Sequence, residues 1–264
     1  MSTTELLMLL MSSVLVRSLP AQDIAMADSF KRTIAPLPTG YNDTKTENQL
    51  STGKLIVPSA LITAGILSLT TKGMKNLNSS TRFEIYEHQP KHTLWDNYTQ
   101  YAPVMLVYGL NLAGVKGKHN LHDRTLIYAT SQLIATAMVV PLKYATREAR
   151  PDGSDFRSFP SGHTATAFSS AQFMFREFRN NNFWLSIAGY PIAVFTGVYR
   201  TFNNKHWAGD VLAGAGIGIL STEIAYWLSP ISTRLLGGQK QDHYKVLLPQ
   251  YNNGTYGLTY TQNF

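Results

Sequence analysis

The chain has 264 residues, no cysteine, and 23 Lys and Arg against 16 Asp and Glu, which gives a net charge of +7. This length allows one domain with tails, and the lack of cysteine excludes disulfides. The basic residues form no continuous face interleaved with aromatics, which argues against nucleic-acid binding. An anionic substrate or an anionic membrane surface explains the charge better.

The N-terminus has features of an export signal. An apolar run over 6–16 is followed by Leu19-Pro20-Ala21, although no Lys or Arg precedes the run. This pattern predicts a signal peptide, or a signal anchor, over residues 1–21, with cleavage after Ala21. Residues 22–54 are polar and predict a loosely structured lead-in.

The body of the chain alternates apolar stretches with polar joins. The stretches without Asp, Glu, Lys or Arg are 55–71, 97–115, 125–142, 158–175, 183–199 and the shorter 211–222. Their length and small residues predict helices, so we expect an all-α bundle of about six core helices over residues 55–230. Several stretches approach the roughly 20 residues of a membrane crossing, which favours a membrane-embedded bundle. The mean hydropathy of −0.11 is low for such a protein, and a soluble all-α enzyme is the alternative.

The C-terminal tail, residues 231–264, has a different pattern. Segments 244–251 and 255–264 flank Asn252-Asn253-Gly254, and Asn-Gly is a strong hairpin signal. Two strands cannot close a barrel, so a surface β-hairpin that packs on something else is expected.

Three short motifs lie at ends of the apolar stretches: KYATREARP (143–151), FPSGH (159–163) and RTFNNKHWAGD (200–210). In the first, Lys143 and Arg150 are two helical turns apart, so we expect both on one helix face, with Arg147 between them and the helix ending at Pro151. The second predicts the start of a helix, where free N–H groups favour an anion. In the third, Asp210 follows His206 by four residues, so on a helix it can orient the imidazole.

Each motif alone has an ordinary interpretation: a solvated basic helix end, a turn with a helix cap, or a structural histidine. The ordered set favours phosphate chemistry, because it combines cations, two histidines, a serine and a carboxylate. The set resembles the signature of the type 2 phosphatidic acid phosphatase and vanadium haloperoxidase superfamily, which reads K-x6-RP, PSGH and SR-x5-H-x3-D. The resemblance covers residues from about 100 to 228. The chain departs from it at Tyr199, which replaces the signature serine, and in the short linker between Pro151 and Pro160.

The resemblance implies a role for each matching residue. His206 would attack phosphorus and form a phosphohistidine, Asp210 would hold its ring, and His163 would protonate the leaving oxygen. The phosphoryl oxygens would be held by Lys143, Arg150, Arg200, the Ser161 hydroxyl and the Gly162 amide. Guanidinium groups match phosphate oxygens in bidentate fashion, which supports this assignment independently. No metal or other cofactor is expected, since the histidines lack HxxxH or HExxH spacing.

The resemblance also implies a function. We expect a phosphatase acting on a phosphate monoester or diphosphate of a membrane lipid, with lipid A as the first candidate and with no obligate protein partner. The alternatives are a prenyl diphosphate or phosphatidate-type phosphatase, a soluble periplasmic acid phosphatase of broad specificity, a haloperoxidase, or an inactive membrane scaffold.

The joins opposite the motifs predict an orientation. They carry an excess of cations, which favours the cytoplasmic side and places the site on the periplasmic face of the inner membrane. These cations are Lys116, Lys118, Arg124, Arg176 and Arg179. An export signal agrees with this orientation only if segment 55–71 does not fully cross the membrane.

Overall fold

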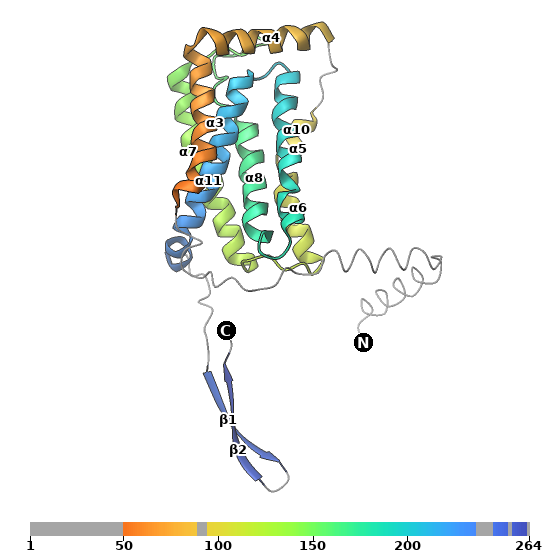
Figure 1. Cartoon of the computed structure of the whole chain (residues 1–264), viewed down its shortest axis with the longest axis vertical. Coiled ribbons are helices and arrows are strands. Elements are labelled where there is room, and N and C mark those ends of the chain that lie inside the picture. Colours follow the sequence, from red (N-terminus) through yellow and green to blue (C-terminus); the bar gives the residue numbers. More distant parts are fainter. Residues whose placement is uncertain (1–49, 89–93, 236–244, 253–254, 263–264) are drawn as a thin grey trace, which may run out of the picture.

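The computed structural model describes residues 50–88, 94–235, 245–252 and 255–262, so the predicted signal lies outside the described residues. The described part is a bundle of helices with a separate β-hairpin (Figure 1). In chain order the helices are α3 (Thr52–Thr70), α4 (Lys72–His88), α5 (Trp95–Thr99), α6 (Ala102–Leu112), α7 (Leu121–Thr146), α8 (Gly162–Phe178), α9 (Phe183–Ile187), α10 (Gly189–Phe202) and α11 (Ala208–Leu235). The strands are β1 (Lys245–Asn252) and β2 (Thr255–Gln262). The all-α bundle predicted from the sequence is confirmed.

Helix α11 is central to the bundle and contacts α3, α7 and α8, while α10 packs on α8. Its glycines and alanines allow close approach to its neighbours. A Cβ added to Gly65 of α3 would lie 2.6 Å from the Cβ of Ala213, and one on Gly216 would lie 2.6 Å from the Pro58 carbonyl oxygen. Small residues at helix contacts are typical of membrane bundles, where packing drives association.

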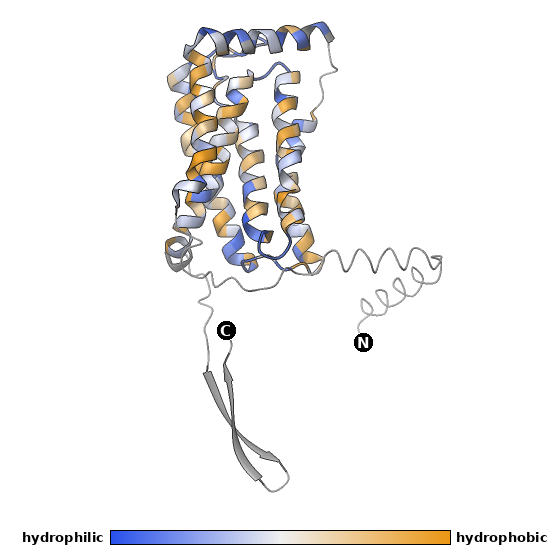
Figure 2. Cartoon of the chain, viewed as in Figure 1, coloured by the Kyte–Doolittle hydropathy of each residue, from blue (hydrophilic) through white to orange (hydrophobic). Residues whose placement is uncertain are grey.

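Among the described residues, three helices are long and apolar enough to cross a membrane: Thr52–Thr70, Leu121–Thr146 and Ala208–Ser232. Figure 2 shows apolar residues along the long helices and hydrophilic ones in α4 and in loops at the bundle ends. Helices α3 and α7 expose large apolar side chains, among them Ile56 (63% exposed) and Leu133 (71%). Exposed apolar surface of this kind favours contact with lipid over contact with water.

Two predicted stretches are each split into two helices. Segment 97–115 contains the end of α5 and all of α6, with Pro103 in the first turn of α6, where its missing N–H costs nothing. Segment 183–199 contains α9 and most of α10, which are separated at Ala188. The polar join after 71 forms the helix α4, which lies across one end of the bundle (Figure 1) and was not predicted.

The predicted C-terminal hairpin is confirmed. Strands β1 and β2 pair antiparallel, with Asn252 opposite Thr255 at the turn. Among the described elements these strands contact only each other, so the packing partner expected for the hairpin is not found there.

Candidate active site

The three motifs meet at the end of the bundle that α4 crosses. Helices α7 and α10 end there, and α8 and α11 begin there, so residues far apart in the sequence are brought together. The backbone N–H of Ser161 donates to the Asp210 carbonyl oxygen over 3.0 Å, which joins the start of α8 to the first turn of α11.

The first motif differs from the expected single helix. Helix α7 ends at Thr146, and Arg147 adopts a left-handed conformation with φ 47°, so Arg147 and Arg150 do not continue the helix. The chain turns here because the following loop folds back over the helix end: Lys143 Nζ donates to the carbonyl oxygens of Arg157 (2.8 Å) and Ser158 (3.3 Å). Arg147 is exposed, whereas Arg150 is partly buried and bonded to Asp155 Oδ1 at 2.8 Å.

The second motif begins a helix, as predicted. Ser161 is the N-cap of α8 and is fully buried, and its hydroxyl oxygen lies 3.5 Å from the Thr164 N–H and 2.8 Å from the Thr164 hydroxyl. Gly162 is the first residue of α8, so its N–H is among the groups left free by the helix. The positive end of α8 therefore faces this part of the site.

The third motif places a histidine against a buried carboxylate. His206 precedes α11, and its Nδ1 lies 3.4 Å from Asp210 Oδ2 in the first turn of that helix. Asp210 Oδ2 also accepts the Ser158 hydroxyl (2.5 Å) and the Trp207 N–H (2.9 Å), which fix its position. With Nδ1 directed at Asp210, Nε2 is the ring nitrogen left to act on a substrate.

Both histidines are held neutral at pH 7 by their surroundings. Burial lowers the pKa of His206 to about 4, against the opposing influence of Asp210 and with help from the charges of Arg200 and Lys143. Burial and the charge of Arg200 likewise lower the pKa of His163 to about 4. These mutual influences show that the two histidines and the basic residues share one electrostatic environment. A neutral imidazole is the form that can act as a nucleophile.

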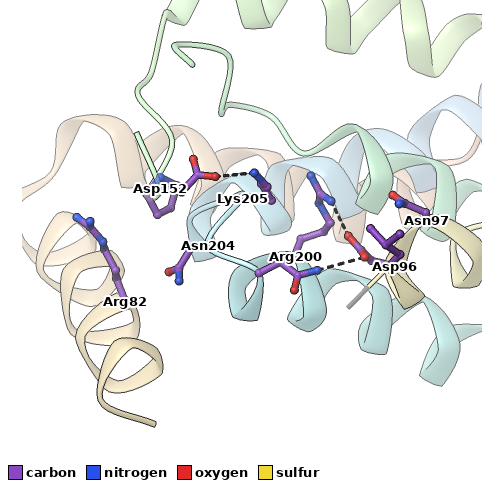
Figure 3. A pocket seen from close by; sticks show the side chains of 10 residues that line it. Arg82, Asp96, Asn97, Asp152, Arg200, Asn204 and Lys205 are labelled. Carbon is purple, nitrogen blue, oxygen red and sulfur yellow. Dashed lines mark hydrogen bonds and ion pairs between the residues drawn. The ribbon is translucent and has the colours of Figure 1, made fainter. Parts of the chain in front are cut away.

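Arg200 links the site to a cavity. Its Nη1 donates to Asp96 Oδ2 at 2.5 Å (Figure 3). Asn203 Nδ2 donates to the other oxygen of Asp96 at 3.2 Å. The Nε of Arg200 is buried and has no hydrogen-bond partner in the described part of the chain, so one strong donor is left for an anion. Arg200 and Asp96 line a cavity of about 700 Å³, together with Asn97 and residues of the neighbouring loops.

Of the residues predicted for the site, only Arg200 lines this large cavity; His206 lines a neighbouring cavity of about 10 Å³. The other predicted residues line neither of these two cavities. Among the described residues, no group of three histidine or carboxylate side chains lies close enough to hold a metal ion.

Four residues at the site were not found by sequence reasoning. Asn97 Oδ1 lies 2.8 Å from His163 Nε2, Asp96 holds Arg200, and Ser158 binds Asp210. Asp96 and Asn97 are more than 60 residues from their partners in sequence, and no spacing rule connects them. Glu148 lies inside the first motif, and the presence of an acidic residue among cations is the sequence feature that could have marked it as part of the site.

Glu148 contacts Asp210 in an unusual way. Glu148 Oε2 and Asp210 Oδ1 are both buried, and neither accepts a hydrogen bond from a described residue. Burial, and then the negative charge of the adjacent Asp210, raises the pKa of Glu148 to about 8, while Lys75 acts in the opposite direction. A proton on Glu148, shared with Asp210, would satisfy both oxygens at neutral pH.

A neutral histidine paired with a buried carboxylate, among basic side chains and a helix N-terminus, has the chemical groups that phosphoryl transfer requires. The comparisons with known proteins agree with this class. Residues 124–234 match the PAP2 superfamily, and this match confirms the family resemblance of the motif-bearing segment.

Two named relatives and one solved structure are similar to parts of the chain. The lipid A 1-phosphatase of Porphyromonas gingivalis is 42% identical over 144 residues, which cover 54% of this chain and 32% of that protein. The bacitracin transport permease protein BcrC of Bacillus licheniformis is 36% identical over 73 residues, which cover 28% of this chain and 34% of that protein. The aligned part thus spans about a third of each relative's length.

The solved structure is a transmembrane PAP2 type phosphatidylglycerolphosphate phosphatase from Bacillus subtilis. It is 18% identical, has a TM-score of 0.39, and covers 70% of this chain and 98% of its own. The long apolar helices and their exposed apolar side chains indicate a membrane protein.

Proposed function

We propose that this protein is a membrane-embedded phosphatase that hydrolyses a phosphate monoester or diphosphate of a lipid, with lipid A as the best candidate. The observation that carries the proposal is the His206–Asp210 pair, which lies among the cations of the site within a family-matched segment. The 42% identity to a lipid A 1-phosphatase supports lipid A over other lipids. The phosphatase domain is proposed to span residues 55–230.

The proposed reaction has two steps. Nε2 of His206 attacks phosphorus, the ester P–O bond breaks, and His163 gives a proton to the leaving oxygen. Water then attacks the phosphohistidine and loses a proton to His163, which releases inorganic phosphate and restores both histidines. Lys143, Arg150, Arg200, the Ser161 hydroxyl and the Gly162 amide stabilise the charge on the phosphoryl oxygens.

The protonation of His163 follows from substrate binding. Its pKa of about 4 in the free site leaves it neutral, but a bound phosphate brings negative charge that raises the pKa of a neighbouring imidazole. Asn97 holds Nε2 of the ring in place, since an amide oxygen accepts a hydrogen bond from that nitrogen. The acid is thus formed only when a substrate is present.

The direct test measures phosphate release by the purified chain in detergent from lipid A, a prenyl diphosphate, phosphatidate and nitrophenyl phosphate. Lipid A should give the largest kcat/KM. With substrate labelled in phosphorus, a quench in alkali should trap label on the protein, and His206→Ala should lose it. Preference for nitrophenyl phosphate, or absence of label on the wild-type chain, would contradict the proposal.

We also propose that the site faces the periplasm from the inner membrane. Fewer loop cations support this orientation than the sequence suggested. Arg124 and Arg176 are each 1% exposed and paired with buried carboxylates, so they do not count as loop charges. Lys116, Lys118 and Arg179 are the cations that support a cytoplasmic position for the opposite end. Since α3 is long enough to cross, a periplasmic site requires that residues 1–21 do not cross.

The absence of native cysteine makes this orientation directly testable. Ser51→Cys, before α3, and Arg157→Cys, in the loop at the site, both lie at exposed positions. A membrane-impermeant thiol reagent added to intact spheroplasts should label the Arg157 variant and spare the Ser51 variant. The reverse labelling pattern would place the site in the cytoplasm.

A further inference from the structure

Helix α4 is docked on the site by one face. Asn78, Arg82 and Ile85 are spaced i, i+4 and i+7, so they lie on the same side of the helix. Asn78 is 6% exposed and accepts a hydrogen bond from the Gly209 N–H (3.2 Å), and Ile85 is 7% exposed. Arg82 is exposed, but it lies between these two buried neighbours on the face of α4 that is turned toward the site, and it lines the cavity there.

The Arg82 guanidinium lies at the junction of the cavities. It is 5.7 Å from the ring centroid of Trp207, the residue that follows His206. Arg82 lines both the cavity of about 700 Å³ and the small one that His206 lines. Figure 3 shows Arg82 on one side of the large cavity and Arg200 with Asp96 on the other.

The charges around the large cavity leave Arg82 without a counterion. The two carboxylates that line the cavity each form an ion pair with another cation: Asp96 with Arg200 at 2.5 Å, and Asp152 with Lys205 at 2.6 Å. Among the described residues, Arg82 forms no ion pair. A guanidinium held at a cavity wall without a carboxylate favours an anion in that cavity.

The size of the cavity indicates a ligand larger than one phosphate. Sites for small-molecule ligands have volumes of roughly 300–1,000 Å³, and this one falls within that range. A phosphoryl group at Arg200 and His206 would leave room for the rest of a headgroup toward Arg82. Helix α4 also lies outside the family-matched residues 124–234, so Arg82 is not part of the shared signature.

We propose that Arg82 binds a second anionic group of the substrate, a phosphate or a group of similar charge, in the part of the cavity away from Arg200. The inference rests on the proposed function for the first phosphate. Arg82 would then select lipids whose headgroup carries two anionic groups over those that carry one.

The test uses inorganic phosphate and a series of alkyl bisphosphonates with spacers of increasing length, bound to the full chain in detergent and measured by calorimetry. In the wild type, at least one bisphosphonate should bind more tightly than phosphate. Arg82→Gln should weaken the binding of that bisphosphonate about tenfold, as expected for the loss of one charged hydrogen bond. It should change the affinity for inorganic phosphate less than about twofold. Lys72→Gln, an exposed cation on the same helix, is the matched control and should change neither.

Each other outcome has a defined meaning. Equal weakening of phosphate and bisphosphonate by Arg82→Gln would show that Arg82 only holds α4 or Trp207 in place. Tight phosphate binding with no preference for any bisphosphonate would overturn the second subsite and leave the proposed function intact. Failure of the wild type to bind either ligand would overturn both proposals.

Discussion

At the end of the bundle opposite the candidate site, α7, α8 and α11 bury two ion pairs, Arg124 with Glu177 (3.1 Å) and Arg176 with Glu223 (2.9 Å). The Arg176 guanidinium also lies 4.5 Å from the ring centroid of Tyr226. Every carboxylate oxygen of the two glutamates has a donor. The remaining partners of Glu177 are the Tyr226 hydroxyl and the backbone N–H and ring Nδ1 of His119, and the remaining partner of Glu223 is the Gln172 side chain.

At the site end, buried charge is arranged differently. Glu148 Oε2 and Asp210 Oδ1 face each other without a donor from the described residues. Arg200 Nε has no acceptor there, but this is not particular to the site, since Arg124 Nη1 at the far end also lacks one among the described residues. A cavity adjoins these groups. Buried charge alone therefore does not mark function in this protein. The carboxylates of the far end all have donors and join helices, whereas the site end keeps buried carboxylate oxygens for a proton and a guanidinium beside a cavity for a ligand.

The largest expected difference between the ends concerns their histidines. His206→Ala removes the proposed nucleophile, so phosphate release should fall by more than about a thousandfold. His122→Ala, at an exposed histidine at the start of α7, should leave kcat/KM unchanged. Steady-state kinetics on lipid and soluble substrates would check both, and substantial turnover by the His206 variant would remove it from the mechanism.

At the far end, the expected loss is in stability. Glu223→Ala leaves Arg176 buried without its carboxylate, which should lower the free energy of unfolding by about 3–5 kcal/mol. The fraction that stays folded should retain wild-type kcat, as measured by denaturation in detergent alongside activity. A double variant with Arg176→Met should recover part of the stability. A fall in kcat without a fall in stability would show that the two ends are coupled.

The two arginines of the first motif provide a matched pair at the site end. Arg150→Gln should weaken competitive inhibition by vanadate about ten- to a hundredfold, since vanadate has the charge and shape of phosphate. Arg147→Gln should have less than about a twofold effect, because Arg147 is exposed where the chain leaves α7. Equal effects of the two substitutions would show that the wrong cation was assigned to the phosphate.

The sequence predicted the bundle because apolar stretches and their polar joins follow the period and length of helices. It also predicted the contact of His206 with Asp210, since four residues is a distance that one turn can bridge. It did not predict the end of α7 at Thr146, where the Lys143 side chain binds loop carbonyls that come from a later segment. Asp96 was missed for a related reason, because only the packed fold brings α5 to Arg200.

The last prediction concerns the proton of Glu148, which has no counterpart at the ion-paired carboxylate of Glu177. Its folded-state pKa of about 8 lies above its ordinary value of 4.5, chiefly because of burial and then because of Asp210. Ionisation of Glu148 is therefore harder in the folded state than in the unfolded state. The folded protein is most favoured below pH 4.5 and loses this contribution as the pH rises from 4.5 toward 8. Glu148→Gln keeps a donor for Asp210 Oδ1 but cannot ionise, so its thermal midpoint relative to the wild type should rise steadily across that window. A constant difference between the two midpoints from pH 5 to 8 would show that Glu148 is already ionised and that Asp210 Oδ1 has another partner.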